Sequence, residues 1–280
     1  MIPFSFEYKK AASVKEAISM LDGDAKILGG GHSLIPTLKL RLDSPACLID
    51  ISKIESLQHI RDNDNSISIG AGVTHAQIAE DKSLATHCPM MGQAAKEIGD
   101  IQVRNRGTLG GSIAHADPAA DWPAVLLAAN AQVTIQNSNG TRTVDIDQFF
   151  KGFFETALEE GEIITTITVP KTMANQNSAY VKFKQPASRF AIVGCAVALA
   201  MNGSTIESAR IGLTGVADVT YRPDNVEKAL IGEDLNEASI DKSVQDVTDG
   251  VSVMSDHYAS ESYRKHLAQV FVKRALKKLM

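Results

Sequence analysis

Two glycine-rich segments carry the residues best suited to ligand binding in this chain. The first, Gly29-Gly-Gly-His-Ser33, follows a short apolar stretch, and the second is Thr108-Leu-Gly-Gly-Ser112. Consecutive glycines let backbone N–H groups converge on an anion, because the chain can adopt positive φ and approach closely without a Cβ. Either segment could be an ordinary tight turn. Two of them, with the hydroxyls of Thr108 and Ser112 as extra donors, favour a diphosphate ligand.

Standard nucleotide-binding fingerprints do not account for these segments. The sequence lacks a phosphate-binding loop that ends in Gly-Lys-Ser/Thr, and its near miss to GxGxxG, Gly70-Ala-Gly72-Val-Thr-His75, lacks the third glycine. A Rossmann site is therefore disfavoured, and binding must use another fold. His115 and Asp117 form a lone pair of possible metal ligands, which is more often a loop feature, so no metal is assigned.

The composition is that of a globular protein. A chain of 280 residues with 44% hydrophobic content can bury a substantial core in one large or two modest domains. Its formal net charge of −5 argues against nucleic-acid binding, which needs a concentrated basic surface. No apolar run approaches the roughly 18 residues that span a bilayer, and the N-terminus does not look like a secretory leader. We therefore expect a cytoplasmic protein without a membrane span.

The three cysteines, Cys47, Cys88 and Cys195, lie far apart and form no CxxC pair. This spacing suggests neither a disulfide framework nor a zinc or iron–sulfur ligand set, so we expect three buried thiols. If the protein takes part in electron transfer, an iron–sulfur centre must therefore belong to another chain.

Hydrophobic periodicity predicts the elements that hold the two glycine segments. A capping box at Ser13 predicts a short helix that ends before Asp22, and a turn near Pro36 follows the first glycine segment. The pattern predicts strands at 25–28, 46–51, 132–136, 141–146 and 162–169, a hairpin across 58–69, and helices at 75–80, 90–98 and 118–129.

The composition changes after Pro170. Residues 173–178 are polar and without periodicity, and we place a domain boundary there. Strands are predicted at 180–185, 191–201 and 205–214, the last two joined by Asn202-Gly203. The chain ends in a predicted amphipathic helix, whose apolar face holds Leu267, Val270, Phe271, Ala275 and Leu279.

The glycine segments and their flanks resemble the paired FAD-binding motifs of a known family. The matching stretches are Gly29-Gly-Gly-His-Ser-Leu-Ile-Pro36, Arg104-Asn-Arg-Gly-Thr-Leu-Gly-Gly-Ser112 and Ala116-Asp-Pro-Ala-Ala-Asp121. They resemble the molybdenum hydroxylase flavoproteins, which include the medium subunit of aerobic carbon monoxide dehydrogenase and the FAD domain of xanthine dehydrogenase. The likeness covers essentially the whole chain, including Phe183-Lys-Gln185. The pair of motifs at this spacing is more specific than either alone.

The resemblance implies an α+β fold. It implies a vanillyl-alcohol-oxidase-type FAD-binding domain at 1–172, in lobes of about 1–55 and 56–172, and a smaller α+β C-terminal domain at 173–280 with a three-stranded sheet and helices.

The resemblance also assigns residues to FAD. Those matched to the diphosphate are Gly29, Gly30, Gly31, His32, Ser33, Leu34, Ile35, Pro36, Thr108, Leu109, Gly110, Gly111 and Ser112. Asp121 matches an acidic position near the ribityl chain and ring, and Ile164, Lys184 and Phe190 match positions at the isoalloxazine. Taken alone, Asp121 could simply begin the Trp122 helix, and Lys184 could be a solvated strand residue. Arg189 departs from the aspartate that many relatives carry.

The function implied is that of an electron-transfer subunit. In the family, a large subunit hydroxylates the substrate at a molybdenum cofactor, and two [2Fe–2S] clusters on a small subunit deliver electrons to FAD. The implied assembly is a dimer of heterotrimers, in which this chain needs no catalytic acid or base. The final acceptor could be NAD, a quinone, a cytochrome or oxygen. We also expect Gly110→Val to abolish FAD retention by excluding the diphosphate.

Two other functions fit parts of the pattern. A self-contained FAD oxidase of an alcohol or sugar could share the fold, although roughly 100 residues after Pro170 are few for a substrate domain. A non-catalytic nucleotide-binding protein could use the glycine segments to hold a phosphate without redox chemistry. Flavin absorption in the purified protein separates the second alternative from the others.

Overall fold

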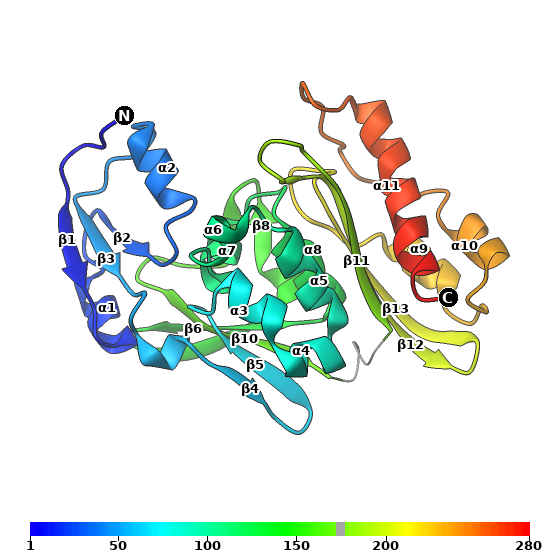
Figure 1. Cartoon of the computed structure of the whole chain (residues 1–280), viewed down its shortest axis with the longest axis horizontal. Helices are drawn as coiled ribbons and strands as arrows, with labels where there is room; N and C mark the ends of the chain where they lie inside the picture. Colours follow the sequence, from blue (N-terminus) through cyan, green and yellow to red (C-terminus); the bar gives the residue numbers. More distant parts are fainter. Residues whose placement is uncertain (172–176) are drawn as a thin grey trace.

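In the part of the chain that the structure describes, three main sheets lie side by side, each accompanied by helices (Figure 1). The computed structural model describes residues 1–171 and 177–280. The N-terminal sheet is parallel, in the order β1 (Glu7–Lys10), β3 (Cys47–Asp50), β2 (Ala25–Leu28). Its connections contain the helices α1 (Val14–Met20) and α2 (Leu34–Lys39). The central strand β3 is nearly all apolar because both its edges are paired and its side chains are buried.

The second sheet has five antiparallel strands in the order β4 (Ile60–Asp62), β5 (Ser66–Gly70), β10 (Ile163–Pro170), β6 (Gln132–Asn137), β7 (Gly140–Asp145). Between β5 and β6 the chain forms six helices that gather over this sheet (Figure 1). They are α3 (His75–Glu80), α4 (Lys82–His87), α5 (Pro89–Glu97), α6 (Ile101–Arg104), α7 (Leu109–His115) and α8 (Asp121–Ala128). The 3-10 turns Glu55–Leu57 and Ile146–Gln148 and the small hairpin β8 (Phe150–Gly152) with β9 (Glu155–Thr156) complete this part.

The third sheet is antiparallel, in the order β11 (Ser178–Lys184), β12 (Ala191–Asn202), β13 (Thr205–Thr214). Helices α9 (Asp224–Leu230), α10 (Glu237–Ser243) and α11 (Glu261–Lys277) cover its outer face (Figure 1). Successive strand residues point to opposite faces. Cys195 and Val197 therefore join the core under α11, while Ala196 and Ala198 pack toward the central helices. At Gly212 the sheet lies so close to α8 that an added Cβ would be 2.0 Å from the Ala124 carbonyl oxygen.

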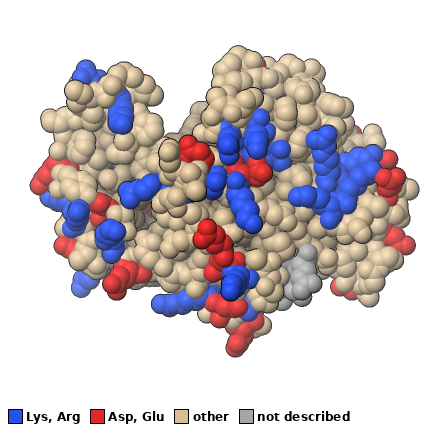
Figure 2. Space-filling model, viewed as in Figure 1, with Lys and Arg blue, Asp and Glu red and all other residues tan. Residues whose placement is uncertain are grey.

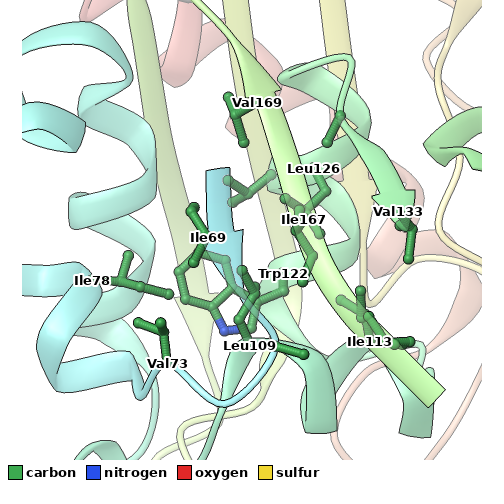
Figure 3. Packing of buried hydrophobic residues seen from close by; sticks show 14 of the residues in the cluster. Ile69, Val73, Ile78, Leu109, Ile113, Trp122, Leu126, Val133, Ile167 and Val169 are labelled. Carbon is green, nitrogen blue, oxygen red and sulfur yellow. The ribbon is translucent and has the colours of Figure 1, made fainter. Parts of the chain in front are cut away.

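The largest core lies between the five-stranded sheet and its helices. Figure 3 shows the indole of Trp122 among Ile69, Val73, Ile78 and Leu109, contributed by β5, α3 and α7 and their connections. Trp122 has no exposed surface, and every residue of α8 is buried. This explains why α8 is apolar on all sides after its first residue, Asp121, without an amphipathic pattern.

The predicted strands and hairpin are confirmed to within a few residues, as are the helices at 75–80 and 90–98, the core of the 118–129 helix and the C-terminal helix. The prediction of a turn near Pro36 is wrong, because α2 occupies that stretch, and the second glycine segment is the first turn of α7 rather than a loop. Strand β1 and the helices α4, α6, α9 and α10 were not predicted. Of the predicted domain boundary at 173–178, residues 173–176 lie outside the described residues. All three cysteines are buried thiols, as expected.

Candidate functional site

A cavity of about 1120 Å³ lies between the N-terminal sheet and the helices of the central part. The space-filling view shows the molecule hollowed between these two parts (Figure 2). Ligand pockets of drug-sized molecules measure roughly 300–1,000 Å³, so this volume suits a ligand as large as a dinucleotide. The predicted residues that line it are Gly29, Gly30, Gly31, His32, Ser33, Leu34, Pro36, Thr108, Gly110, Gly111, Ser112, Asp121, Ile164 and Phe190.

The two glycine segments touch each other at this cavity. A Cβ added to Gly30 would lie 2.2 Å from the Arg106 carbonyl oxygen and 2.8 Å from the Gly107 Cα, distances that real Cβ atoms do not adopt. A Cβ on Gly29 would lie 3.5 Å from the Thr108 hydroxyl oxygen. The absence of side chains here lets two segments about 80 residues apart in the sequence line one wall.

The first segment offers an anion-binding cradle. Within the described part of the chain, the amide N–H groups of residues 29–34 donate no hydrogen bond, although Gly31 and Ser33 accept bonds through their carbonyl groups. Gly31 has a φ of 76°, in the left-handed region that turns successive amides toward one side. Unsatisfied backbone donors in a cavity wall are costly unless a ligand or water pairs with them. This cradle fits a diphosphate.

The second segment differs from the sequence-based expectation. The amides of residues 109–112 are already used: Leu109 N donates to Val73 O at 3.0 Å, Gly110 N to Ala71 O at 2.9 Å, Gly111 N to the Thr108 hydroxyl at 3.0 Å and Ser112 N to Thr108 O at 3.0 Å. Thr108 is thus the N-cap of α7, and its hydroxyl accepts a bond from its own helix. The segment supports the cradle as a packed wall, rather than adding a second set of free amides.

The geometry also changes the explanation of Gly110→Val. A Cβ at Gly110 would meet Ala71, 2.5 Å from its Cβ and 2.7 Å from its carbonyl oxygen, so the added side chain points into the protein and not toward a ligand. Any loss of FAD in this variant would come from displacement of α7. The predicted steric exclusion of the diphosphate by this residue is therefore wrong.

A buried ion pair lies at the end of the cavity nearest the third sheet. Asp121 is the first residue of α8 and is 4% exposed. Its carboxylate accepts bonds from the Tyr180 hydroxyl and from Lys182 Nζ, which lies 2.8 Å from Oδ1. Burial raises the pKa of Asp121, and the ammonium of Lys182 opposes that rise. Asp121 therefore lines the cavity and also joins α8 to β11.

Two apolar side chains line the cavity from other elements. Ile164 lies on the central strand β10 beside a register shift against β6, and such bulges re-aim side chains next to binding sites. Phe190 is 44% exposed and follows Arg189, whose φ is 62°. Lys182 does not line the cavity, but its Nζ donates to the Arg189 carbonyl at 2.8 Å. Arg189 Nη1 donates in turn to Gly99 O at 3.1 Å. These bonds hold the left-handed turn that presents Phe190.

Three predicted residues do not line the cavity. Lys184 forms an exposed ion pair with Glu97 at 3.1 Å, so its predicted place at the flavin ring has no support in this geometry. Leu109 is fully buried in the core. Ile35 packs beneath the first glycine segment, where a Cβ on Gly31 would lie 3.0 Å from its side chain. Both apolar residues support the site from behind.

Sequence reasoning missed several lining residues. Thr74 and His75 belong to the stretch Gly70–His75, which fails the Rossmann pattern, and they line the cavity beside Gly72. The signal was a Gly-Ala-Gly turn at the end of a strand, but it gave no spatial link to the other glycines. Glu162 also lines the cavity, held by Arg142 Nε at 2.7 Å, and no local pattern marks it.

We expect His75 to make the free energy of unfolding fall at low pH. Burial lowers its pKa to about 3, with smaller effects from the charges of His32 and Arg104. Between about pH 6.5 and 3 the unfolded chain binds a proton at His75 that the folded chain does not, so stability falls as pH is lowered through this window. Going from pH 7 to pH 5 should cost about 2 kcal/mol through this residue.

Urea unfolding of the wild type and of His75→Gln at the two pH values measures this effect. The wild type should lose more stability than the variant on acidification. His115, whose pKa is also lowered by burial, acts in the same direction in both proteins and so cancels in the comparison. An equal pH dependence in the two proteins would contradict the prediction.

The comparisons with known proteins agree with this geometry. Residues 4–172 match the family described as the FAD binding domain in molybdopterin dehydrogenase. The chain belongs to this family. Residues 178–279 match the CO dehydrogenase flavoprotein C-terminal domain. The flavoprotein therefore carries both family regions in sequence, and its cofactor is FAD, as predicted.

Relatives match the flavoprotein from end to end. The glyceraldehyde dehydrogenase medium chain of Sulfolobus acidocaldarius is 37% identical, with all of both chains covered. The carbon monoxide dehydrogenase medium chain of Hydrogenophaga pseudoflava is 38% identical, with 99% of this chain and 97% of the relative covered. A solved structure of carbon monoxide dehydrogenase from Hydrogenophaga pseudoflava superposes with a TM-score of 0.95 at 39% identity, covering 99% of this chain and 98% of the other. The predicted family, fold class and role as an oxidoreductase subunit are confirmed.

Proposed function

We propose that this flavoprotein is the FAD-carrying electron-transfer subunit of a molybdenum hydroxylase complex. In this proposal it receives electrons from [2Fe–2S] clusters on a small partner subunit and passes them to an external acceptor. The observation that carries the proposal is the cavity wall of unpaired amides at 29–34, in a chain that belongs to an FAD-binding family. Bound FAD supplies the ability to accept and release electrons.

The residues of this chain would bind and orient the cofactor. The amides of 29–34 would hold the diphosphate, with the hydroxyls of Ser33 and Ser112 nearby in the same wall. Asp121 has acceptor capacity left beyond its bonds to Tyr180 and Lys182, so it could accept a bond from a ribityl hydroxyl. Ile164 and Phe190 would offer apolar surface to the ring. None of these roles needs a general acid or base.

We infer that the partners are a large molybdenum-cofactor subunit and a small [2Fe–2S] subunit, arranged as a dimer of heterotrimers. The full-length match to proteins named medium chains supports a large and a small partner subunit. None of the described helices combines the length and apolar composition that a bilayer-spanning segment needs. We propose a cytoplasmic location, which three unpaired cysteine thiols support, since reducing compartments preserve them.

We also propose a division into an FAD-binding domain at 1–172, with lobes at about 1–55 and 56–172, and a C-terminal domain at 173–280. Two separate clusters of buried apolar residues support it, because the second consists only of residues after 190. The two domains are nonetheless packed together, since Tyr180, Ala196 and Ala198 belong to the first cluster.

Purification of the chain alone and then from its host tests the proposal. The isolated chain should bind FAD at about one equivalent, show flavin absorption, and fail to oxidise alcohols or sugars. Purification from the native host should bring down one larger and one smaller chain, with molybdenum and iron. Turnover of an alcohol by the isolated chain would favour a self-contained oxidase instead. Absence of flavin and of FAD binding would overturn the cofactor assignment.

A further inference from the structure

His75 is a buried polar residue in the cavity wall for which the fold alone gives no complete explanation. It is the first residue of α3, it is 5% exposed, and it lines the cavity. Its backbone N–H donates to Gly107 O at 3.0 Å, which joins α3 to the residue directly before the second glycine segment. In a buried imidazole, both ring nitrogens normally have a hydrogen-bond partner.

The state of the imidazole is set by Trp122. The indole N–H of Trp122 donates to His75 Nδ1 at 3.0 Å, so Nδ1 must be unprotonated. Burial lowers the pKa of His75 to about 3, and the neutral ring therefore carries its proton on Nε2. In the described part of the chain, this Nε2–H donates to no protein acceptor. The result is one fixed, uncharged donor.

Nε2 lies beside the place where the two glycine segments meet. A Cβ on Gly107 would be 2.6 Å from Nε2, so the imidazole packs directly on this glycine. Gly107 in turn lies against Gly30, whose Cβ would be 2.8 Å from the Gly107 Cα. A series of contacts, from Trp122 to His75, from His75 to Gly107 and from Gly107 to Gly30, therefore connects the core of the protein to the amide cradle.

We propose that His75 is a binding residue for the phosphate-bearing middle of FAD, donating its Nε2–H to a diphosphate oxygen beside the amide cradle. The inference rests on the proposed function, because it requires FAD in this cavity. The donor is pre-organised, since Trp122 fixes its ring and its proton, and pre-organised groups lose little freedom on binding. If His75 served only as the hydrogen-bond acceptor of Trp122, replacing it would leave ligand affinity unchanged.

Affinities for whole and partial ligands test this role. The FAD-free chain is titrated with FAD, with ADP, which carries the diphosphate, and with riboflavin, which carries none. His75→Phe should weaken FAD and ADP by about 10- to 100-fold, as expected for a lost bond to a charged group, and leave riboflavin affinity unchanged. His75→Gln, which keeps an N–H donor, should recover part of the loss. His87→Phe, at a surface site outside the cavity lining, is the matched control.

The outcomes separate this inference from the proposed function. Wild-type protein that binds no FAD overturns the proposed function. Wild-type protein that binds FAD while His75→Phe binds FAD and ADP equally well overturns the role of His75 alone. Equal losses for ADP and riboflavin would show a merely structural role and also overturn it.

A measurement on the wild type covers the case in which both variants fail to fold. Nitrogen-15 NMR of labelled histidine should show a proton on Nε2 of His75, and addition of ADP should shift that proton downfield. Riboflavin should not shift it. An Nε2–H signal that ADP leaves in place would overturn the inference.

Discussion

Lys182→Met is expected to lower the free energy of unfolding by about 3–5 kcal/mol, because removing one partner of a buried ion pair leaves the other charge uncompensated. The Lys182 side chain is 0% exposed and its ammonium is 2.8 Å from the Asp121 carboxylate. It also donates to the carbonyl groups of Glu97 and Arg189, at 3.0 and 2.8 Å. Urea unfolding measures the change, and a loss below about 1 kcal/mol would contradict it.

The chain offers a matched control on the same strand. Lys184 lies two residues further along and pairs with Glu97 at 3.1 Å, with side chains 47% and 44% exposed. Exposed pairs contribute about 0–1 kcal/mol, so Lys184→Met should be nearly neutral. Lys182→Met combined with Asp121→Asn should recover part of the stability, since the unpaired charge is gone.

The Lys182→Met deficit should also depend on pH. Without the ammonium, the Tyr180 hydrogen bond is left to oppose the effect of burial, and the pKa of Asp121 rises further above the unfolded value. A group with a raised folded pKa stabilises the fold at low pH and loses that contribution as pH rises through the folded pKa. The difference from wild type should therefore shrink as pH is lowered from about 8 to about 5. A difference that stays constant would mean that Asp121 is not the residue left unpaired.

Gly30→Ala is expected to weaken FAD binding by about 5- to 150-fold. The new Cβ would be 2.2 Å from the Arg106 carbonyl oxygen, and the backbone must move because neither neighbour is the flexible end of a side chain. Moving the first glycine segment away from the second opens the cradle that residues 29–34 form. Overpacking costs about 1–3 kcal/mol, and about 1.4 kcal/mol corresponds to tenfold in affinity.

FAD titration of the purified variant measures this prediction, and circular dichroism checks that the variant is folded. Gly92→Ala is the control, because a Cβ there would meet no atom closer than the Ala79 carbonyl oxygen at 3.9 Å. That control should keep FAD affinity and melt at or slightly above the wild-type temperature, as glycine is unfavourable inside a helix. Wild-type affinity in Gly30→Ala would show that the contact between the segments does not control binding.

The sequence by itself determined the family, the order of most elements and the two glycine segments. These features are local: strand alternation, helical periodicity and consecutive glycines can be read from neighbouring residues. The resemblance carried by the same segments predicted FAD and the fold class. Fourteen of the predicted site residues line one cavity, and eleven of these belong to or adjoin those segments.

Only the tertiary structure decided which donors are free. The amides of 109–112 and those of 29–34 look equivalent in sequence, yet the former bond to Val73, Ala71 and the residues of their own helix. Lys182 and Lys184 look equally placed on β11, but a register shift at Lys184 and the depth of Asp121 separate a buried pair from an exposed one. Likewise, His75 becomes a fixed donor only because Trp122, 47 residues away, contacts its other nitrogen. Burial and hydrogen-bond pairing depend on contacts between distant segments, and no local pattern records those contacts.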